Sequence, residues 1–423
     1  MSTAIIMAKS TILDTALFNL EQVAGRLGVD SQFMEKLAEP KEVINISANP
    51  SLPSGRRLNF KAFIVRHNDA MGPAKGGIRM NPNVTPEDIT GLAMEMTWKT
   101  SLIGVPFGGG KSGICVDAAS LSAADKEAVL RSFTRAACRH IGPEIYIPAP
   151  DMGTNEIDMG HIRDCIAYSS GTSITDGCFV TGKPVILGGI VGRREATGKG
   201  VVYSILAACK NLGIDVTKAR VAVQGFGNVG SVAAFEIARC GAKVVAVSDI
   251  EGGLLNTKGI DMAKLAAHVS QTGSMRGFGE AQTVDNNSVL TCDCEILIPA
   301  ASQSQITNKN ADRIKAKIIA EGANAPTMPE ADEILNRAGK CVIPDILCNA
   351  GGVFVSYLEY TQETQREQMT LSQVESRLKE RMDTKFAEVL NYAQRNMLNL
   401  RQAAMDIAVS RVVDAVEARG FLP

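Results

Sequence analysis

Along the first part of the chain, the spacing of hydrophobic residues changes from that of a helix to that of a strand. Near the N-terminus, apolar residues recur every three or four positions and predict an amphipathic helix. These residues are Leu13, Leu17, Leu20, Ala24 and Leu27. Apolar and polar residues then alternate over 43–47 and 58–65, with Pro-Ser-Gly between the two runs. This pattern predicts a pair of strands joined by a loop.

Helical patterns follow over 86–103 and 123–140. A short apolar run at 145–148 then predicts a strand that leads into Ala149-Pro-Asp151-Met-Gly153. A carboxylate on a turn directly after a strand is well placed to act on a ligand, because rigid elements commonly present reactive groups on their loops. A turn-capping role is the alternative for Asp151.

Strand and helix patterns alternate in the second half of the chain. A helix is expected over 197–212, a strand over 220–224, a helix up to Cys240 and a strand over 243–247. Further apolar runs predict buried strands, and they lie at 295–299, 317–320 and 342–346. Regular alternation of this kind is typical of an α/β fold with a parallel, doubly wound sheet.

Two changes in composition suggest where the domains meet. Residues 181–200 are rich in glycine, lysine and arginine, which suggests a hinge or a passage between domains. The segment after Glu359 is polar and helical, with an amphipathic stripe from Leu371 to Val389. We therefore expect an α/β substrate-binding and oligomerisation domain over 1–190 and a Rossmann-type nucleotide-binding domain over 191–359. Residues 360–423 are expected to pack back on the first domain.

Composition excludes several classes of function. The 423-residue chain has a formal net charge of −1, so no overall field favours nucleic acid or an anionic membrane. It shows neither a signal-peptide pattern nor a run of about 20 apolar residues, and a cytoplasmic location is expected. Its ten cysteines form no Cys-x-x-Cys pair and its four histidines are dispersed. We expect reduced thiols and no metal site.

A glycine-rich turn after the 220–224 strand has the features of a dinucleotide-binding site. Gly225, Gly227 and Gly230 form G-x-G-x-x-G between a strand and a helix, and Asp249 closes the next strand, 24 residues after Gly225. Gly225 would make the tight turn and Gly227 would let the pyrophosphate approach the helix N-terminus. Gly230 would allow close packing of helix on strand, and Asp249 would accept hydrogen bonds from the adenosine ribose.

The preference between NAD and NADP is less determined by the sequence. Glu251 follows Asp249 closely, and no arginine or lysine occurs before Lys258. A second carboxylate near the ribose would repel a 2′-phosphate, which favours NAD. A basic residue distant in the sequence could still supply contacts for NADP.

Three lysines stand beside glycine-rich stretches in the first half. Lys75 precedes Gly-Gly, Lys99 lies in the 86–103 helix, and Lys111 follows Gly108-Gly-Gly110. We interpret the glycine-rich stretches as loops, on which a partly desolvated lysine would have a lowered pKa suited to base chemistry. A cluster of lysines indicates a small, doubly anionic substrate. The run ending in Lys111-Ser112 is not a P-loop, because the first required glycine position is Val105.

An ordered set of motifs along nearly the whole chain resembles a known enzyme family. The motifs are Lys75-Gly-Gly-Ile-Arg79, Trp98-Lys99-Thr-Ser-Leu102, Pro106-Phe-Gly-Gly-Gly-Lys111, Pro150-Asp151-Met-Gly-Thr154, Gly225-Phe-Gly-Asn-Val-Gly230 and Asn349-Ala-Gly-Gly-Val353. Together they resemble the amino-acid dehydrogenases of the glutamate/leucine/phenylalanine/valine group, most closely the glutamate dehydrogenases. The resemblance implies a two-domain enzyme that reversibly converts glutamate to 2-oxoglutarate and ammonium with NAD, NADP being the alternative cofactor, and that assembles as a homohexamer.

The resemblance also implies a role for each matching position. Lys111 would be the catalytic lysine that activates water, and Asp151 would move protons to and from the substrate amine. Lys99 would bind the α-carboxylate, and the side-chain carboxylate would be held by Lys75 and Ser356, with Gly77 beside them. Cofactor contacts are implied for several positions in the second half, namely Thr197, Asn228, Val229, Asn324 and Asn349.

The choice of substrate rests on Lys75 in this interpretation. Relatives that act on branched-chain or aromatic amino acids carry an apolar residue there, and a buried lysine without a carboxylate partner would cost several kcal/mol. Glutamate is therefore favoured, and a branched-chain or aromatic dehydrogenase and a non-catalytic regulatory subunit remain as alternatives. The chain departs from the family pattern at Ser112, which is usually glycine, and over 45–53. The serine puts the pKa of Lys111 and the local geometry in question.

Overall fold

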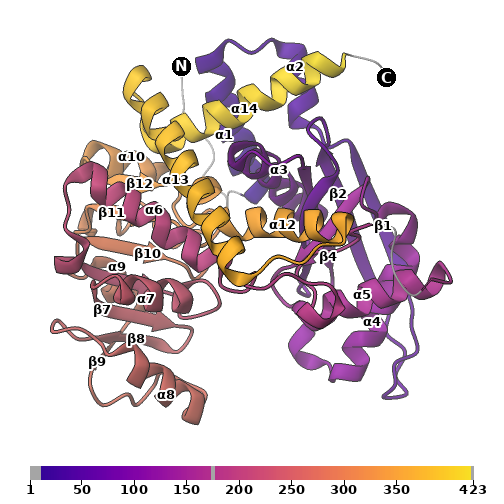
Figure 1. The fold of residues 1–423 in the computed structure, drawn as a ribbon, viewed down its shortest axis with the longest axis horizontal. Helices are drawn as coiled ribbons and strands as arrows, with labels where there is room; N and C mark the ends of the chain where they lie inside the picture. Colours follow the sequence, from indigo (N-terminus) through magenta and orange to yellow (C-terminus); the bar gives the residue numbers. More distant parts are fainter. Residues whose placement is uncertain (1–10, 173–176, 421–423) are drawn as a thin grey trace. The chain divides into compact units, whose positions relative to one another are not determined.

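A computed structural model describes residues 11–172 and 177–420 and divides them into two compact units (Figure 1). The first unit contains the residues up to Val191, the segment Val355–Leu371 and the residues from Met405 onward. The second unit contains Gly192–Phe354 and Ser372–Ala404. The passage from one unit to the other at Val191 falls inside the glycine-rich stretch 181–200.

The first unit is built on a five-stranded mixed sheet with the strand order β1-β2-β4-β3-β5. The strands are β1 (Glu42–Ala48), β2 (Phe60–Asn68), β3 (Ala74–Met80), β4 (Gly108–Ile114) and β5 (Tyr146–Pro150). Strands β1 and β2 form the antiparallel pair predicted from the alternation of apolar residues. Strand β3 lies between β4 and β5 and is parallel to both.

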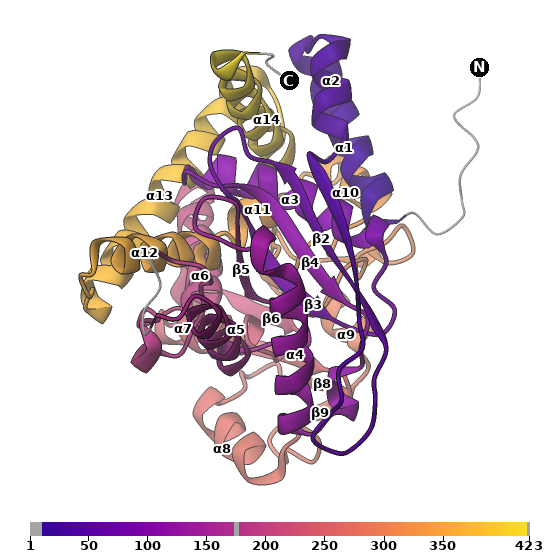
Figure 2. The same cartoon turned by 90° about the vertical axis from the view of Figure 1, so that its right-hand side faces the viewer.

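Helices cover both faces of this sheet (Figure 2). They are α3 (Pro86–Ile103), α4 (Ala123–Ala137) and α5 (Glu156–Ser169), while α1 (Ile12–Leu27) packs on α3 and α2 (Ser31–Ala38) packs on α1. On one face, Phe63 and Val65 of β2 pack with Ile89 and Ala93 of α3. On the other face, Ile64 of β2 and other strand residues form a larger core with α4 and α5. The predicted α/β class of this part of the chain is confirmed.

Helix α3 has strong start and stop signals in its sequence. Thr85 caps its N-terminus by accepting a hydrogen bond from the backbone N–H of Asp88, and Pro86 occupies the first turn. Gly104 ends the helix in a left-handed conformation with φ 74°. Almost the entire last half of the helix is buried, including Lys99. The helix therefore brings a lysine into the protein interior next to the sheet.

The glycine-rich stretches around Lys75 and Lys111 are strands, so the interpretation as loops was wrong. Glycine normally weakens a strand, but here side chains would not fit. A Cβ at Gly76 would lie 1.6 Å from the carbonyl oxygen of Gly110. A Cβ at Gly109 would lie 2.1 Å from Oγ1 of Thr97 on α3. Close packing of the sheet and α3, and not freedom of the backbone, explains these glycines.

The second unit contains a seven-stranded sheet with the order β12-β11-β10-β6-β7-β8-β9. The strands are β6 (Arg220–Gln224), β7 (Lys243–Asp249), β8 (Gly252–Leu255), β9 (Gln282–Val284), β10 (Ile296–Pro299), β11 (Ile318–Ala320) and β12 (Cys341–Ile343). The strands from β12 to β7 are parallel, as predicted. Strands β8 and β9 extend the sheet in antiparallel fashion, which the sequence did not predict.

Helices of the second unit connect these strands. They are α6 (Ala196–Leu212), α7 (Gly230–Arg239), α8 (Met262–Thr272), α9 (Asn286–Thr291), α10 (Pro329–Arg337) and α11 (Asp345–Cys348). The strand expected over 342–346 ends at Ile343, because Pro344 starts α11 directly afterwards. The other strands and helices that the sequence predicted in this unit lie in the predicted order, whereas helices α8 to α11 were not predicted.

The C-terminal helices are divided between the two units. They are α12 (Gly351–Gln365), α13 (Leu371–Asn396) and α14 (Leu400–Arg419). Within the second unit, α13 packs on the start of α12, because Cδ1 of Leu378 lies 3.2 Å from where a Cβ added to Gly351 would be. In the first unit, the hydroxyl of Ser101 donates to the carbonyl of Ala408 on α14 at 2.8 Å. The segment 360–423 therefore does not return to the first unit as a whole, since Ser372–Ala404 packs with the second.

No helix in the described part of the chain is long and apolar enough to cross a bilayer. The cysteines are free thiols. Among the same residues, no cluster of three or more histidine, cysteine or carboxylate side chains could hold a metal ion.

Candidate active site

Lys111 and Asp151 form an ion pair on the face of the sheet that α3 covers. The Nζ atom of Lys111 lies 2.8 Å from Oδ2 of Asp151. Arg79 approaches the same oxygen, with its Nε at 3.3 Å. The register of β3 between β4 and β5 brings these residues together from three strands or strand ends. The structure thus joins two residues predicted separately from the sequence.

Burial changes the pKa of both members of this pair. Burial lowers the pKa of Lys111, and the positive charges of Arg79 and Lys99 lower it further, while Asp151 acts in the opposite direction. Burial alone would raise the pKa of Asp151, but the charges of Lys111 and Arg79 outweigh it and hold that pKa below its usual range. The aspartate is therefore ionised at neutral pH, and the lysine loses its proton more easily than a solvated lysine does.

Arg79 is a site residue that the sequence reasoning did not assign. Along β3, side chains alternate between the two faces, so Lys75, Gly77 and Arg79 share one face. The signal was present in the sequence as the two-residue spacing from Lys75 to Arg79. The prediction did not use this spacing because the stretch was interpreted as a loop. In a loop, a two-residue spacing does not show which way the side chains point.

Local packing fixes the orientation of Asp151. A Cβ at Gly77 would lie 2.6 Å from Cβ of Asp151, so only glycine leaves room for the aspartate here. The backbone N–H of Asp151 donates to Oγ1 of Thr154 at 2.9 Å, and that hydroxyl donates to the carbonyl of Ile78 at 2.8 Å. Gly153 turns the chain with φ 80°. The turn after β5 is thereby attached to β3.

The remaining predicted substrate residues are all buried in the first unit. Lys75 on β3 is 2% exposed, Lys99 on α3 is 5% exposed and Ser356 on α12 is 1% exposed. Lys99 lies close enough to Lys111 to affect its pKa. Burial of several lysines in one unit is unusual, because a charged ammonium loses hydration there. Such burial is consistent with a site built for an anionic ligand.

Ser112 lies on the opposite face of the sheet from the Lys111 side chain. Its hydroxyl donates to the phenolic oxygen of Tyr146 at 2.9 Å, and the tyrosine donates to the carbonyl of Gly76 at 3.1 Å. Neighbouring residues of a strand point to opposite faces. The hydroxyl is therefore directed away from the Lys111 amine, and it links β4 to β5 on the core side.

The glycine-rich turn of the second unit has the form that a dinucleotide requires. Gly225 has φ 91°, and a Cβ at Gly230 would lie 1.8 Å from the carbonyl oxygen of Gly225. A Cβ at Gly227 would meet nothing within 4 Å. Helix α7 starts without a side-chain cap at Val229, so no capping side chain occupies the position that an anion would take at the helix N-terminus. Asn228, beside Gly227, is exposed. These features fit a bound pyrophosphate.

Asp249 lies at the end of β7, as predicted for a residue that binds the ribose. Its Oδ1 accepts a hydrogen bond from the backbone N–H of Glu251 at 2.8 Å, and its carbonyl accepts one from Asn286 at 3.2 Å. The carboxylate of Glu251 accepts a hydrogen bond from the hydroxyl of Ser274. The turn after β7 is thus held by Asp249, and Ser274 holds the side chain of Glu251.

The other predicted cofactor residues lie at the carboxyl end of β11 and at helix starts. The Nδ2 of Asn349 donates to Oδ1 of Asn324 at 3.0 Å and to the carbonyl of Ala323 at 3.2 Å. The Oδ1 of Asn349 is buried and has no hydrogen-bond partner among the described residues. Thr197 lies in the first turn of α6. The Oδ1 of Asn349 is thus an acceptor suited to a hydrogen bond from the carboxamide of a nicotinamide.

A buried ionic network supports the Asn324 segment. Arg401 lies 2.6 Å from Oε1 of Glu321, and the other oxygen of Glu321 accepts the backbone N–H of Asp345 at 2.9 Å. Asp345 in turn accepts the N–H of Ala325 at 2.8 Å. Both carboxylate oxygens of Glu321 are therefore engaged. In the structure it anchors the turn that carries Asn324.

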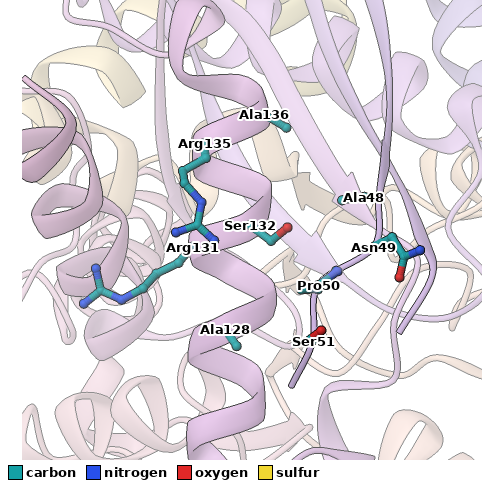
Figure 3. A pocket seen from close by; sticks show the side chains of 9 residues that line it. All are labelled: Ala48, Asn49, Pro50, Ser51, Ala128, Arg131, Ser132, Arg135 and Ala136. Carbon is teal, nitrogen blue, oxygen red and sulfur yellow. The ribbon is translucent and has the colours of Figure 1, made fainter. Parts of the chain in front are cut away.

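A surface pocket of about 640 Å³ lies elsewhere in the first unit (Figure 3). It is lined by the segment Ala48–Ser51 and by residues of α4, including Arg131 and Arg135, which project from the same helix. None of its lining residues is a predicted site residue. The candidate chemistry lies with the buried lysines and not with this pocket.

Comparison with known proteins identifies the family. Residues 40–168 match the dimerisation domain of the Glu/Leu/Phe/Val dehydrogenases, and residues 188–420 match the glutamate/leucine/phenylalanine/valine dehydrogenase domain. The chain belongs to the Glu/Leu/Phe/Val dehydrogenase family. It is therefore an amino-acid dehydrogenase, an oxidoreductase that uses a nicotinamide dinucleotide.

Similar proteins extend over the whole chain. Glutamate dehydrogenase of Thermotoga maritima is 42% identical over 418 residues, which cover 99% of this chain and 100% of that protein. Glutamate dehydrogenase A2 of Halobacterium salinarum is 40% identical with the same coverage. Among solved structures, hetero-hexameric glutamate dehydrogenase from Thermus thermophilus in a leucine-bound form has a TM-score of 0.94 at 33% identity and covers 100% of both chains.

Proposed function

We propose that this enzyme reversibly converts L-glutamate, water and NAD⁺ to 2-oxoglutarate, ammonium and NADH. The observation that carries this proposal is the buried Lys111–Asp151 pair in a unit that also buries Lys75 and Lys99. The names of relatives that are 40–42% identical over 418 residues support the same activity. We assign substrate binding to the first unit and cofactor binding to the second.

The two carboxylates of glutamate would meet different lysines. Lys99 binds the α-carboxylate, and Lys75 with Ser356 binds the side-chain carboxylate, while Gly77 leaves space beside them. Lys75 is 2% exposed, so water screens the attraction between its ammonium and a distal carboxylate only weakly. A substrate without a distal carboxylate lacks this attraction, which favours glutamate over leucine or phenylalanine.

The residues of the first unit would carry out the proton transfers. When bound, the dinucleotide accepts the hydride from Cα of the substrate, and the substrate becomes an iminium. Lys111 in its neutral form accepts a proton from water as the water attacks the iminium carbon. Asp151, which takes a proton from the substrate ammonium before the hydride leaves, returns that proton to the amine nitrogen of the carbinolamine. The nitrogen then leaves as ammonia while Asp151 accepts the proton of the carbinolamine hydroxyl, which forms the ketone. Arg79 lies 3.3 Å from the same carboxylate oxygen and keeps Asp151 ionised between transfers.

Residues of the second unit would hold NAD. The N–H groups around Gly225, Gly227, Asn228, Val229 and Gly230 would bind the pyrophosphate. The ribose would bind Asp249, and the nicotinamide end would meet Thr197, Asn324 and Asn349. Glu251, two residues after Asp249 and hydrogen-bonded to Ser274, would repel the 2′-phosphate of NADP. The preference for NAD over NADP rests on this pair of carboxylates.

A homohexamer is the proposed assembly. A structure of similar fold is a hetero-hexameric glutamate dehydrogenase, and the match to it covers the full length of both chains. Light scattering of the purified protein tests this proposal, and a monomer at micromolar concentration would contradict it.

Initial rates on the purified protein test the function directly. Glutamate and leucine are compared, each with NAD⁺ and with NADP⁺. With NAD⁺ we expect kcat/KM for glutamate to exceed that for leucine by about 100-fold or more, since the loss of one buried charge pair is worth about 3 kcal/mol or more. With glutamate we expect kcat/KM to be higher for NAD⁺ than for NADP⁺. A preference for leucine would overturn the assignment of Lys75. Absence of turnover with every combination would favour a regulatory subunit instead.

A further inference from the structure

A buried ion cluster in the first unit joins α12 to the segment around Lys183. The Nζ atom of Lys183 lies 2.7 Å from Oε1 of Glu359 and 2.7 Å from Oε2 of Glu363. It also donates to the carbonyl of Val180 at 2.7 Å. The side chains of Lys183 and Glu359 are 1% and 0% exposed. None of these groups takes part in the proposed reaction.

Every polar atom of the Glu359 carboxylate is engaged. One oxygen accepts the backbone N–H of Gly182 at 2.8 Å, and the other accepts the Lys183 ammonium. Burial alone would lower the pKa of Lys183, but the charges of Glu359 and Glu363 outweigh it and raise that pKa above its ordinary value. The lysine therefore stays charged at neutral pH, so the cluster does not act as a proton carrier.

The segment that Glu359 binds lies against the strand that carries Asp151. The N–H of Thr181 donates to the carbonyl of Pro148 in β5 at 3.0 Å. Gly182 has φ 78°, and a Cβ there would lie 2.5 Å from Cδ of Pro150, which immediately precedes Asp151. Through Gly182 the cluster thus attaches α12 to the end of β5.

Ser356 lies one turn before Glu359 on α12, and residues three apart share one side of a helix. A second contact holds the same helix from another direction. The ring of Phe107, just before β4, meets Tyr357 and Tyr360 edge-on, with ring centroids 5.9 Å and 5.2 Å apart. Between these two contacts, α12 has little freedom to slide or rotate within the first unit.

We propose that Lys183 is a positioning residue that acts through Glu359 to set where the Ser356 hydroxyl meets the distal carboxylate of a dicarboxylic amino acid. This inference rests on the proposed function. A buried ion pair is often no more stable than an apolar pair of the same volume. What the ion pair adds is direction, because each charged group is fixed by several hydrogen bonds to a defined backbone position.

The substitution Lys183→Met tests the proposal with two substrates of equal length. Glutamate carries the distal carboxylate, and norvaline ends in a methyl group at the same carbon. We expect kcat/KM for glutamate to fall by about 10- to 100-fold, mainly through KM, because misplacement by about 1 Å is enough for such losses. Norvaline is expected to change by less than about 3-fold, since it makes no contact with Ser356 through a carboxylate. Thr364→Ala, at an exposed position on the same helix, is the matched control and should leave both values unchanged.

A second variant covers the case in which Lys183→Met leaves Glu359 unpaired and the protein fails to fold. Lys183→Met/Glu359→Leu removes the two fully buried charges, and the partly exposed carboxylate of Glu363 keeps Arg163 as an ion-pair partner at 3.6 Å. We expect it to fold and to retain the lowered ratio of glutamate to norvaline activity. A folded double variant with the wild-type ratio, or an equal loss for both substrates, would overturn the positioning role alone. Wild-type protein that does not turn over glutamate would overturn the proposed function and this inference with it.

Discussion

At the scale of single residues, the pKa of Lys111 decides the chemistry. Folding lowers this pKa, because burial and the neighbouring positive charges disfavour the ammonium form. The reactive amine is the neutral form, so kcat/KM for deamination should rise with pH and level off above an apparent pKa below the ordinary lysine value of 10.5. The pKa of Asp151 is lowered too, so the titration of Asp151 cannot produce this rise of kcat/KM with pH. A pH–rate profile with glutamate measures the effect.

Replacement of Lys111 by arginine separates charge from proton transfer. Arginine can still pair with Asp151 but cannot lose a proton in the accessible pH range. We expect Lys111→Arg to fold and kcat to fall by about 100- to 10,000-fold, the usual contribution of a general base. Lys61→Arg, at an exposed lysine on β2, is the control. A kcat for Lys111→Arg near the wild-type value would show that Lys111 is not the base.

At the scale of elements, the glycines of β4 determine how closely α3 approaches the sheet. A Cβ at Gly109 would lie 2.1 Å from Oγ1 of Thr97 and 2.3 Å from the carbonyl of Ala93, so α3 would have to move. We expect Gly109→Ala to lower the free energy of unfolding by about 3 kcal/mol, as overpacking does. Gly25→Ala in α1 has open space and should instead stabilise the protein by about 0.5–1 kcal/mol. Urea denaturation measures both, and equal effects would contradict the packing argument.

Elements with ordinary hydrophobic periods could be predicted from the sequence, whereas the β3–β4 core of the site could not. The helix 86–103 and the strand 220–224 were predicted with their observed bounds. In both, residues that start or end an element stand directly beside the apolar pattern. Strands β3 and β4 were missed, since glycine has a low strand propensity and its role here is to let α3 pack closely on the sheet, which the residue pattern of the strands themselves does not show. The same error hid Arg79, while Lys111 and Asp151 were found through their motifs.

At the scale of the whole molecule, the candidate substrate and cofactor residues belong to different compact units. Lys75, Lys99, Lys111, Asp151 and Ser356 lie in the first unit, and the glycine-rich turn lies in the second. Cofactor binding should therefore be separable from the chemistry of the lysines. A substitution in the second unit that blocks the dinucleotide should leave the Lys111–Asp151 pair and the folded state intact.

Gly227 offers such a substitution. A Cβ there meets no protein atom within 4 Å, so Gly227→Val should leave the melting temperature of the unliganded protein within about 2 °C of wild type. The added side chain would occupy the space through which the pyrophosphate approaches α7. NADH at 100 times its Kd stabilises a protein by about 2.7 kcal/mol, and this stabilisation should vanish in Gly227→Val. Gly279→Val, equally open and in the same unit, should keep it. Thermal unfolding with and without NADH distinguishes the two variants. If NADH stabilised Gly227→Val as fully as wild type, the open space at Gly227 would not be the place where the dinucleotide binds.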